Sequence, residues 1–201
     1  SIFGSGAVGG SIHLNNTSNF KQQSKINLAL ERGSFGLAAH QIELNHASNR
    51  HFFKLNYNKL EHENNFSFIN TTKINHPLEY YKHARVESEH LQSVFAYKYN
   101  TNTKLEAHFW KAINSREIPA NMTVPNATAM QYDNANRLLL KVTHLLAGGK
   151  LNLTLARMEE DFNYVDETKN IDSKILAKSY IANTDYAYYF NLATLNLGAA
   201  L

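Results

Sequence analysis

Apolar and polar residues alternate along most of this chain of 201 residues. In the stretch KINLALER, Ile26, Leu28 and Leu30 are separated by Asn27 and Ala29. The stretches FFKLNYN and KLNLTLA repeat the same pattern further along the chain. Because successive side chains of a β-strand point to opposite faces, each stretch predicts a strand with one apolar and one polar side. This period of two predicts an all-β fold.

The pattern predicts nine strands and no helix. Most of them reach the length of about 9–11 residues that a strand needs to cross a bilayer, whereas strands of soluble proteins usually have about 5–6. The length of the strands therefore favours an antiparallel transmembrane sheet. The predicted strands are 25–32, 36–45, 50–60, 84–99, 104–115, 136–146, 150–162, 174–188 and 192–201.

Short and long connections are expected to alternate between these strands. Tight turns are predicted near Ala47 and Thr101 and at 147–149 and 190–191. The long connections are 61–83, 116–135 and 163–173, and they contain all three prolines, Pro77, Pro119 and Pro125. Outer-membrane barrels show this alternation, with short turns on the periplasmic side and longer loops outside. The first connection, GSF at 33–35, is short although it belongs to the long-loop side.

Aromatic residues gather toward the ends of the strands that carry the tight turns. Such a grouping is typical of the aromatic girdle at a membrane interface, although tyrosine and phenylalanine are also common in strands generally. The residues concerned are Phe52, Phe53, Tyr97, Tyr99, Tyr186, Tyr188, Tyr189 and Phe190.

Composition excludes several other classes of protein. Hydrophobic residues make up 43% of the chain and charged residues 18%, which argues against disorder. A net charge of +3 without basic clusters predicts no nucleic-acid binding. The chain has no cysteine, and the adjacent carboxylates Glu159 and Glu160 would point to opposite faces of a strand. We therefore expect no enzymatic activity, no cofactor and no metal site.

A glycine-rich stretch, FGSGAVGGSIHLNN at 3–16, precedes the first predicted strand of the alternating pattern. It closely resembles the end of the plug domain of TonB-dependent outer-membrane receptors, where such a motif leads into the last plug strand. A dinucleotide-binding site would need a helix after the glycines and a βαβ unit, and the sequence predicts neither. The motif residues that carry the resemblance are Phe3, Gly4, Gly6, Ala7, Gly9 and Gly10.

Three later stretches add to the resemblance. HENNFSF at 62–68 is similar to the opening of an external loop in these receptors. NSREIPANM at 114–122 and QYDNANRL at 131–138 are similar to the passages around the fifth and sixth barrel strands. The resemblance implies that residues 1–20 are the C-terminal end of a plug domain and residues 21–201 the first part of its barrel. Because members of the family have a plug inside a 22-stranded barrel, we expect a partial barrel wall, with the rest of the plug and the later strands outside this sequence.

The family resemblance also implies a function, namely TonB-energised uptake across the outer membrane of a Gram-negative bacterium. The expected substrate is a ferric siderophore or a related metal chelate, with haem and cobalamin as further members of the class. The expected partners are this small molecule, the lipid bilayer, and TonB through the missing N-terminal part. The polar faces of the strands would line the lumen, and the leucine-rich faces would contact lipid.

Other classes of β-protein remain as alternatives. A structural or adhesive outer-membrane barrel without transport would keep the long loops but would not need the plug-like opening. An outer-membrane hydrolase would need a Ser/His/acid arrangement on one rim, and no nucleophile-elbow motif is present. A soluble sandwich is disfavoured by the length of the strands and by the asymmetry of the connections.

Candidate ligand contacts lie in the predicted external connections. Histidine beside carboxylates is able to bind transition metals or haem iron, aromatic rings anchor ligands, and arginine attracts anionic chelates. Each of these residues also has an ordinary role as solvated loop polarity, loop packing or a rim charge. The candidates are His62, His76, Tyr80, Tyr81, His83 and Arg116.

Overall fold

The computed structural model describes residues 18–123 and 126–201, and within them nine strands form one antiparallel sheet. Each of the nine pairs with its neighbours in chain order, and β1 and β11 form the two open edges of the described sheet. The all-β prediction and the nine predicted strands are confirmed. The strands are β1 (Gln23–Arg32), β2 (Ala38–Ala47), β3 (His51–His62), β6 (Val86–Lys98), β7 (Thr103–Glu117), β8 (Met130–Leu146), β9 (Gly149–Asp166), β10 (Ile171–Tyr189) and β11 (Thr194–Ala200).

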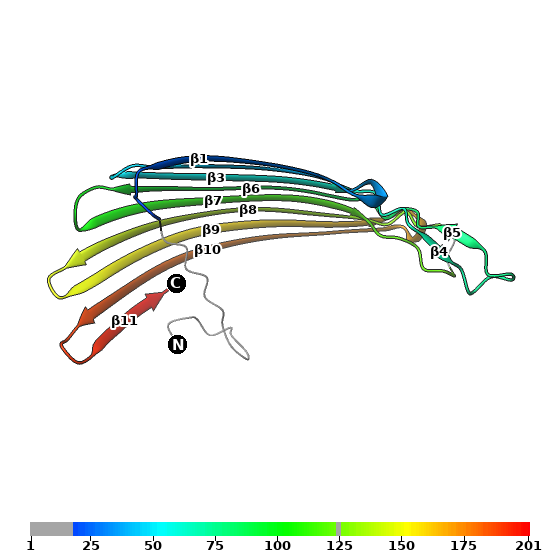
Figure 1. Ribbon diagram of the computed structural model, residues 1–201. Coiled ribbons are helices and arrows are strands. Elements are labelled where there is room, and N and C mark those ends of the chain that lie inside the picture. The colour runs from blue at the N-terminus through cyan, green and yellow to red at the C-terminus, as the bar shows by residue number, and fades with distance from the viewer. Residues whose placement is uncertain (1–17, 124–125) are drawn as a thin grey trace.

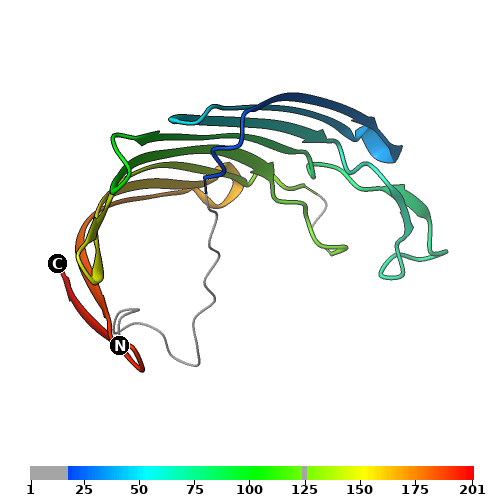
Figure 2. The same ribbon diagram turned by 60° about the vertical axis from the view of Figure 1, so that its left-hand side comes forward.

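The sheet is a long curved wall with two different ends (Figures 1 and 2). One end, here called the turn end, carries the short connections 48–50, 99–102, 147–148 and 190–193. The opposite loop end carries two short 3₁₀ turns, Ser34–Gly36 and Glu167–Lys169, and a hairpin of β4 (Ser67–Ile69) and β5 (Leu78–Tyr80). No helix in the described ranges is long and apolar enough to cross a membrane.

Three predicted strand boundaries at the loop end are wrong. The long connection expected at 163–173 is a four-residue loop, because β9 continues to Asp166 and β10 already begins at Ile171. Similarly, β8 begins at Met130 rather than at 136. The segments concerned are rich in Asn, Asp and Gln, which sequence patterns assign to loops, yet they continue the backbone ladder with their neighbours. The strands therefore extend beyond the region in which their hydrophobicity alternates.

The segment before β1 identifies the concave face of the wall. Ser18 Oγ donates a hydrogen bond to Glu106 Oε1 at 2.8 Å. The ring of Phe20 lies 6.4 Å from that of Phe52, and Lys98 Nζ lies 4.2 Å from the Phe20 ring centre. Glu106, Phe52 and Lys98 thus point to the side on which the chain enters β1, which is the inside of the curve (Figure 1).

The concave face is polar across the first half of the sheet. Asn27, Glu43, Asn56 and Gln92 lie side by side in one row of paired residues across β1, β2, β3 and β6. Glu43 also forms an ion pair with Lys54, with Oε1 and Nζ 3.3 Å apart. The predicted polar sides of the first and third strands therefore share this face.

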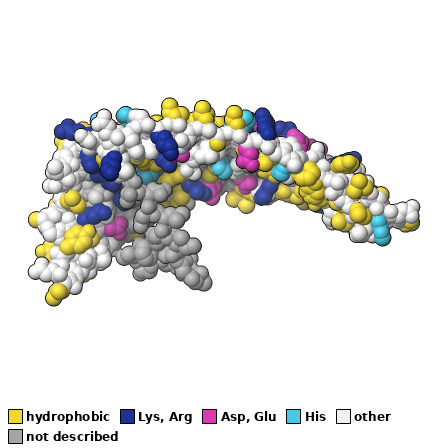
Figure 3. Space-filling model, in the orientation of Figure 1, with side chains coloured by type: hydrophobic (Ala, Val, Ile, Leu, Met, Phe, Trp, Pro, Cys, Tyr) yellow, Lys and Arg dark blue, Asp and Glu magenta, His cyan; other side chains and the backbone are white. Residues whose placement is uncertain are grey.

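The convex face is apolar and exposed along much of the sheet. Leu28 and Leu30 on β1 are 71% and 79% exposed, and Leu155 on β9 is 57% exposed. Figure 3 shows hydrophobic side chains standing along the upper, convex edge. The described chain thus presents an extended apolar surface on the outside of the curve. Large exposed apolar patches of this kind mark contact with a partner or a membrane.

The apolar band crosses the rows of paired residues obliquely. One row begins with the apolar residues Leu28, Ile42, Tyr57 and Leu91 and ends with the polar residues Lys111, Asn136, Glu159 and Lys178. Two convex-face rows closer to the turn end, the polar residues come first and the apolar ones last. That row begins with Ser24 and His46 and ends with Leu140, Leu155 and Ala182. The rows of paired residues run perpendicular to the strands. An apolar band that crosses these rows obliquely therefore implies that the strands are tilted away from the perpendicular to the band.

Aromatic side chains lie at the turn end, as predicted. Tyr186 and Tyr188 cover the glycines of the β8–β9 turn: a Cβ atom added to Gly149 would lie 2.7 Å from the Tyr186 hydroxyl, and one added to Gly148 would lie 3.1 Å from the Tyr188 ring. Gly148 also has a positive φ of 75°, which suits a two-residue hairpin turn. These tyrosines therefore pack against a turn that requires glycine.

Candidate functional site

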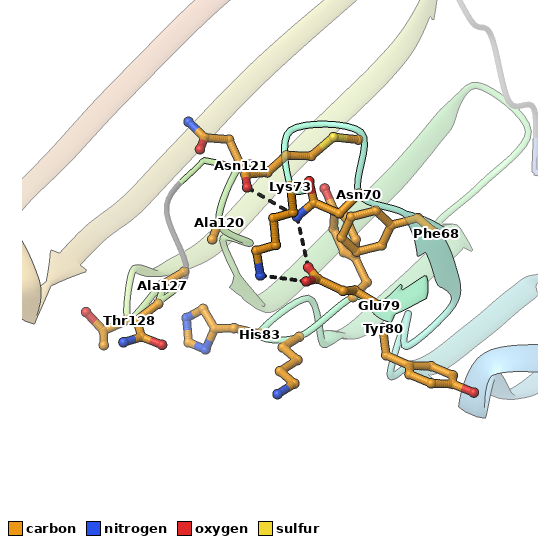
Figure 4. Close-up of a pocket in the computed structure, with 14 residues that line it drawn as sticks. Phe68, Asn70, Lys73, Glu79, Tyr80, His83, Ala120, Asn121, Ala127 and Thr128 are labelled. Atoms are coloured by element: carbon orange, nitrogen blue, oxygen red, sulfur yellow. Dashed lines mark hydrogen bonds and ion pairs between the residues drawn. The ribbon is translucent and has the colours of Figure 1, made fainter. Parts of the chain in front are cut away.

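The principal cavity at the loop end lies between the β4–β5 hairpin with its following segment and the loop that joins β7 to β8. It has a volume of about 820 Å³. Figure 4 shows its walls, with Lys73 and Glu79 on the hairpin side and Ala120, Ala127 and Thr128 on the loop side. The lining residues are Phe68, Asn70, Lys73, Glu79, Tyr80, Tyr81, Lys82, His83, Ala120, Asn121, Met122, Asn126, Ala127 and Thr128.

Asn70 fixes the hairpin to the opposite wall of the pocket. Its side chain is 1% exposed. Its Oδ1 accepts hydrogen bonds from the Thr72 backbone N–H at 3.0 Å and from the Thr72 hydroxyl at 2.6 Å. Its Nδ2 donates to Glu79 Oε2 at 2.9 Å and to the Met122 carbonyl at 3.4 Å. One buried amide therefore connects the turn, the β5 strand and the β7–β8 loop.

Glu79 is held in its ionised form inside this hairpin. The hydrogen bond from Asn70, followed by that from Lys73, lowers the pKa of the Glu79 carboxyl below its ordinary value. Lys73 Nζ lies 2.5 Å from Glu79 Oε1. Lys82, which also lines the pocket, has no ion pair in the described part of the chain. The lining therefore carries a small excess of positive charge, which favours an anionic ligand.

An aromatic cluster supports the same side of the pocket. Tyr81 stacks on Phe66 with ring centres 4.7 Å apart and meets the edge of Phe68 at 5.5 Å. Phe35 of the first loop contacts Phe66 edge to face at 6.0 Å. Tyr80 is 63% exposed and points away from the other labelled side chains (Figure 4). The cluster orients Tyr81 and Phe68 toward the cavity, while Tyr80 lies free at its rim.

His83 joins the pocket to the sheet. Its Nε2 lies 2.8 Å from the Ala129 carbonyl oxygen, so this nitrogen carries a proton and donates it. Its Nδ1 lies 3.7 Å from Glu117 Oε1. Both ring nitrogens of His83 are therefore directed at protein groups, one at the β7–β8 loop and one at the end of β7.

Three of the six predicted contact residues, Tyr80, Tyr81 and His83, line this pocket. His62 and Arg116 lie instead on β3 and β7, in one row of paired residues that runs through Val86. The His62 Nε2 is 3.3 Å from the Ser34 carbonyl oxygen. His76 belongs to the turn of the hairpin, outside the pocket lining. Contact of any of the six with a ligand stays a prediction.

Sequence reasoning missed Asn70, Lys73, Glu79 and the loop residues around Met122. A local signal for Asn70 exists, because an asparagine side chain often closes a turn by bonding the backbone two residues further on. No signal in the sequence pairs that turn with Met122, 52 residues away. In the described ranges, no group of three or more histidines and carboxylates is placed to hold a metal ion.

No protein-family model matches the chain, and the search of curated proteins finds no match. The plug-like motif residues Phe3 to Gly10 lie outside the described residues.

Proposed function

We propose that this chain forms part of the wall of an outer-membrane transport barrel in a Gram-negative bacterium. The observation that carries the proposal is the oblique apolar band on the convex face, opposite a concave face that is polar across the first half of the sheet. Strands of a membrane barrel are tilted by about 35–45°, so a level lipid-facing band must cross their pairing rows at an angle. In a soluble sandwich the apolar side chains would instead face the interior between two sheets.

The lengths of the strands agree with this arrangement. β8, β9 and β10 have 17, 18 and 19 residues, more than the about 9–11 needed to span a bilayer. The excess lies toward the loop end, where polar residues continue the ladder beyond the apolar band. The strands would therefore project above the outer surface of the membrane and carry the loop-end pocket on their tips.

Transport, rather than a purely structural role, is supported by the segment before β1. Ser18 and Phe20 follow the plug-like motif directly and contact Glu106 and Phe52 on the concave face. A chain that leaves a plug inside the barrel would enter the wall from this side. Coupling to TonB through the plug then supplies the energy for uptake.

The loop-end pocket is the proposed first contact for the substrate. Its exposed lysines and the aromatic rings of Tyr81 and Phe68 suit an anionic ligand with flat groups, which is the chemistry of a ferric siderophore or a related chelate. Haem and cobalamin belong to the same proposed class of scarce nutrients.

The test is uptake by the source bacterium after deletion of the gene for the natural full-length protein. Labelled ferric siderophores, haem and cobalamin are supplied to the deletion strain, to the parent and to a strain without TonB. We expect uptake of one compound to be lost in both mutants and restored by the wild-type gene. Restoration by a Tyr81→Ala and Lys82→Ala double variant should be weaker than by an Asn65→Ala control, whose exposed side chain lies in the same loop. Unchanged uptake of every compound in the deletion strain would favour the structural barrel instead.

A further inference from the structure

A cluster of basic side chains borders the apolar band on the convex face of β7 to β10. Lys111 and Lys178 lie in one row of paired residues, with Asn136 and Glu159 between them. Arg157 lies in the next row of the convex face toward the turn end, beside Leu138 and Tyr180. These three basic residues, which we call the basic cluster, span three strand spacings, or about 14 Å at about 4.8 Å each.

Among the described residues, Glu159 is the one acidic partner of the basic cluster. Arg157 Nη2 is 2.9 Å from Glu159 Oε2, and Lys178 Nζ is 3.1 Å from Glu159 Oε1. Lys111 is exposed and forms no ion pair with any described residue. Two positive charges therefore remain uncompensated within the cluster.

The other half of the convex face has the opposite balance. We compare the four convex-face rows that begin with Arg32, Leu30, Leu28 and Ile26. In these rows, strands β7 to β10 carry four basic and two acidic residues, whereas β1, β2, β3 and β6 carry two basic and three acidic ones. The first set is Lys111, Arg157, Lys174, Lys178, Glu159 and Asp161, and the second is Arg32, Lys59, Glu61, Glu87 and Glu89. The positive charge is thus concentrated on one side of the wall.

Apolar side chains lie beside and below Arg157: Leu138 and Tyr180 flank it in its own row, and Leu155 lies in the next convex-face row toward the turn end. Leu138 is 41% exposed, Leu155 is 57% exposed and Tyr180 is 69% exposed. A ligand that fits this surface has an anionic head at the level of the lysines and hydrocarbon chains on the leucines. Long basic side chains at the border of a lipid-facing band place their charges at the headgroup level in this way. A small soluble anion would use only the upper half of this surface.

We propose that the basic cluster binds the phosphate-bearing headgroup of an anionic membrane lipid, whose acyl chains lie along Leu138 and Leu155. The inference rests on the proposed membrane orientation of the sheet. It adds a specific lipid contact on the outside of the wall, separate from the substrate pocket at the loop end. The binding would anchor one side of the barrel at a fixed height in the membrane.

The test measures binding of fluorescent phosphatidylglycerol, with phosphatidylcholine as the neutral probe, to the natural full-length protein in a neutral detergent. A triple variant, Lys111→Ala, Arg157→Ala and Lys178→Ala, should bind phosphatidylglycerol about a hundredfold more weakly than the wild type, at roughly fivefold for each of the three charges removed, and phosphatidylcholine equally well. The matched control is Lys59→Ala on β3, whose Nζ is 2.6 Å from Glu61 Oε1. This control should retain wild-type binding.

Two further measurements keep the result unambiguous. Lys111→Ala removes the residue that has no ion pair, so it should weaken binding even if the triple variant fails to fold. Inorganic phosphate should not displace the lipid, and displacement would indicate a site for soluble anions and overturn the proposal. Equal binding by the wild type and Lys111→Ala, or equal loss in the Lys59→Ala control, would also overturn it. If instead the proposed membrane orientation of the sheet is wrong, labels placed at Leu28 and Leu153 would be accessible to water, whatever the result of the lipid-binding test.

Discussion

The ring of Phe20 packs against the ring of Phe52 with centres 6.4 Å apart, and this contact attaches the chain ahead of β1 to the concave face of the sheet. Phe52 is also the largest member of a small buried cluster with Ala47 and Ala96. The same residue therefore packs against neighbouring strands of the sheet and holds the entering segment against its concave face.

A double-mutant cycle measures this attachment. Phe52→Ala should lower the free energy of unfolding by about 3 kcal/mol, because it empties a buried site, and Phe20→Ala should cost less. The double variant should show a coupling of about 0.5–1.5 kcal/mol, the range for aromatic pairs. Denaturant unfolding of the protein in detergent gives these values. Strictly additive effects would mean that the two rings do not interact in solution.

Removal of the Asn70 side chain should open the loop-end pocket without unfolding the sheet. Asn70→Ala deprives Glu79, Thr72 and Met122 of buried hydrogen-bond partners, a local cost of about 1–3 kcal/mol. Tryptic cleavage after Lys73 should become faster, while the far-ultraviolet circular dichroism stays unchanged. Asn65→Ala is the matched control and should be cut at the wild-type rate. A wild-type cleavage rate for Asn70→Ala would show that this amide does not hold the hairpin.

Acidification should weaken the β9–β10 loop only at very low pH. Asp166 lies at the loop end, beyond the proposed membrane span, where the Thr168 hydroxyl, at 2.6 Å, and Lys169 lower its carboxyl pKa from 3.8 to about 2. Because the folded pKa is depressed, this stabilisation is complete above about pH 4 and is lost as the pH falls through about 2.

A carbon-detected NMR titration of the Asp166 carboxyl checks this expectation. The midpoint should lie near 2 in the wild type and move upward in a Thr168→Val variant, which removes the hydrogen bond from the Thr168 hydroxyl that contributes most to the lowered pKa. A wild-type midpoint near 3.8 would contradict the hydrogen-bonding seen around Asp166.

Gly149 is predicted to be intolerant of a side chain. A Cβ atom there would lie 2.8 Å from the Ala187 carbonyl oxygen of β10, and a backbone atom cannot turn aside. Gly149→Ala should lower the free energy of unfolding by about 1–3 kcal/mol. Gly198→Ala provides the control, since its added Cβ atom would lie 3.1 Å from the Asp185 side chain and in ordinary contact, at 3.5 Å, with the Thr184 carbonyl oxygen, and should cost less. Equal unfolding free energies for the two variants would contradict this packing.

The sequence predicted the sheet well where its two faces differ in environment. Leu28 and Asn27 have opposite surroundings, so the alternation of apolar and polar residues marks the strand. Toward the loop end, through residues such as Asn163 and Asp172, apolar and polar residues no longer alternate although the hydrogen-bonded ladder continues. This is why β8 and β10 begin earlier than expected and why β9 ends later.

The pocket was only partly predictable for a related reason. Tyr81 and His83 were found because their residue types suit ligand contacts in a long connection. The β4–β5 hairpin has strands of three residues each, which are too short to show a period. The contact of Asn70 with Met122 depends on the fold, since it joins two separate connections.

The central claim is that the convex face meets lipid and the concave face does not. Because the chain has no cysteine, single-cysteine variants at Asn27, Leu28, Asn152 and Leu153 provide unique sites for nitroxide labels in the natural full-length protein. In native outer membranes, labels at Leu28 and Leu153 should be accessible to oxygen dissolved in lipid and protected from a water-soluble relaxation agent, and labels at Asn27 and Asn152 should show the opposite preference. Labels at Leu28 and Leu153 that are as accessible to the water-soluble agent as their asparagine neighbours would contradict the membrane-spanning wall.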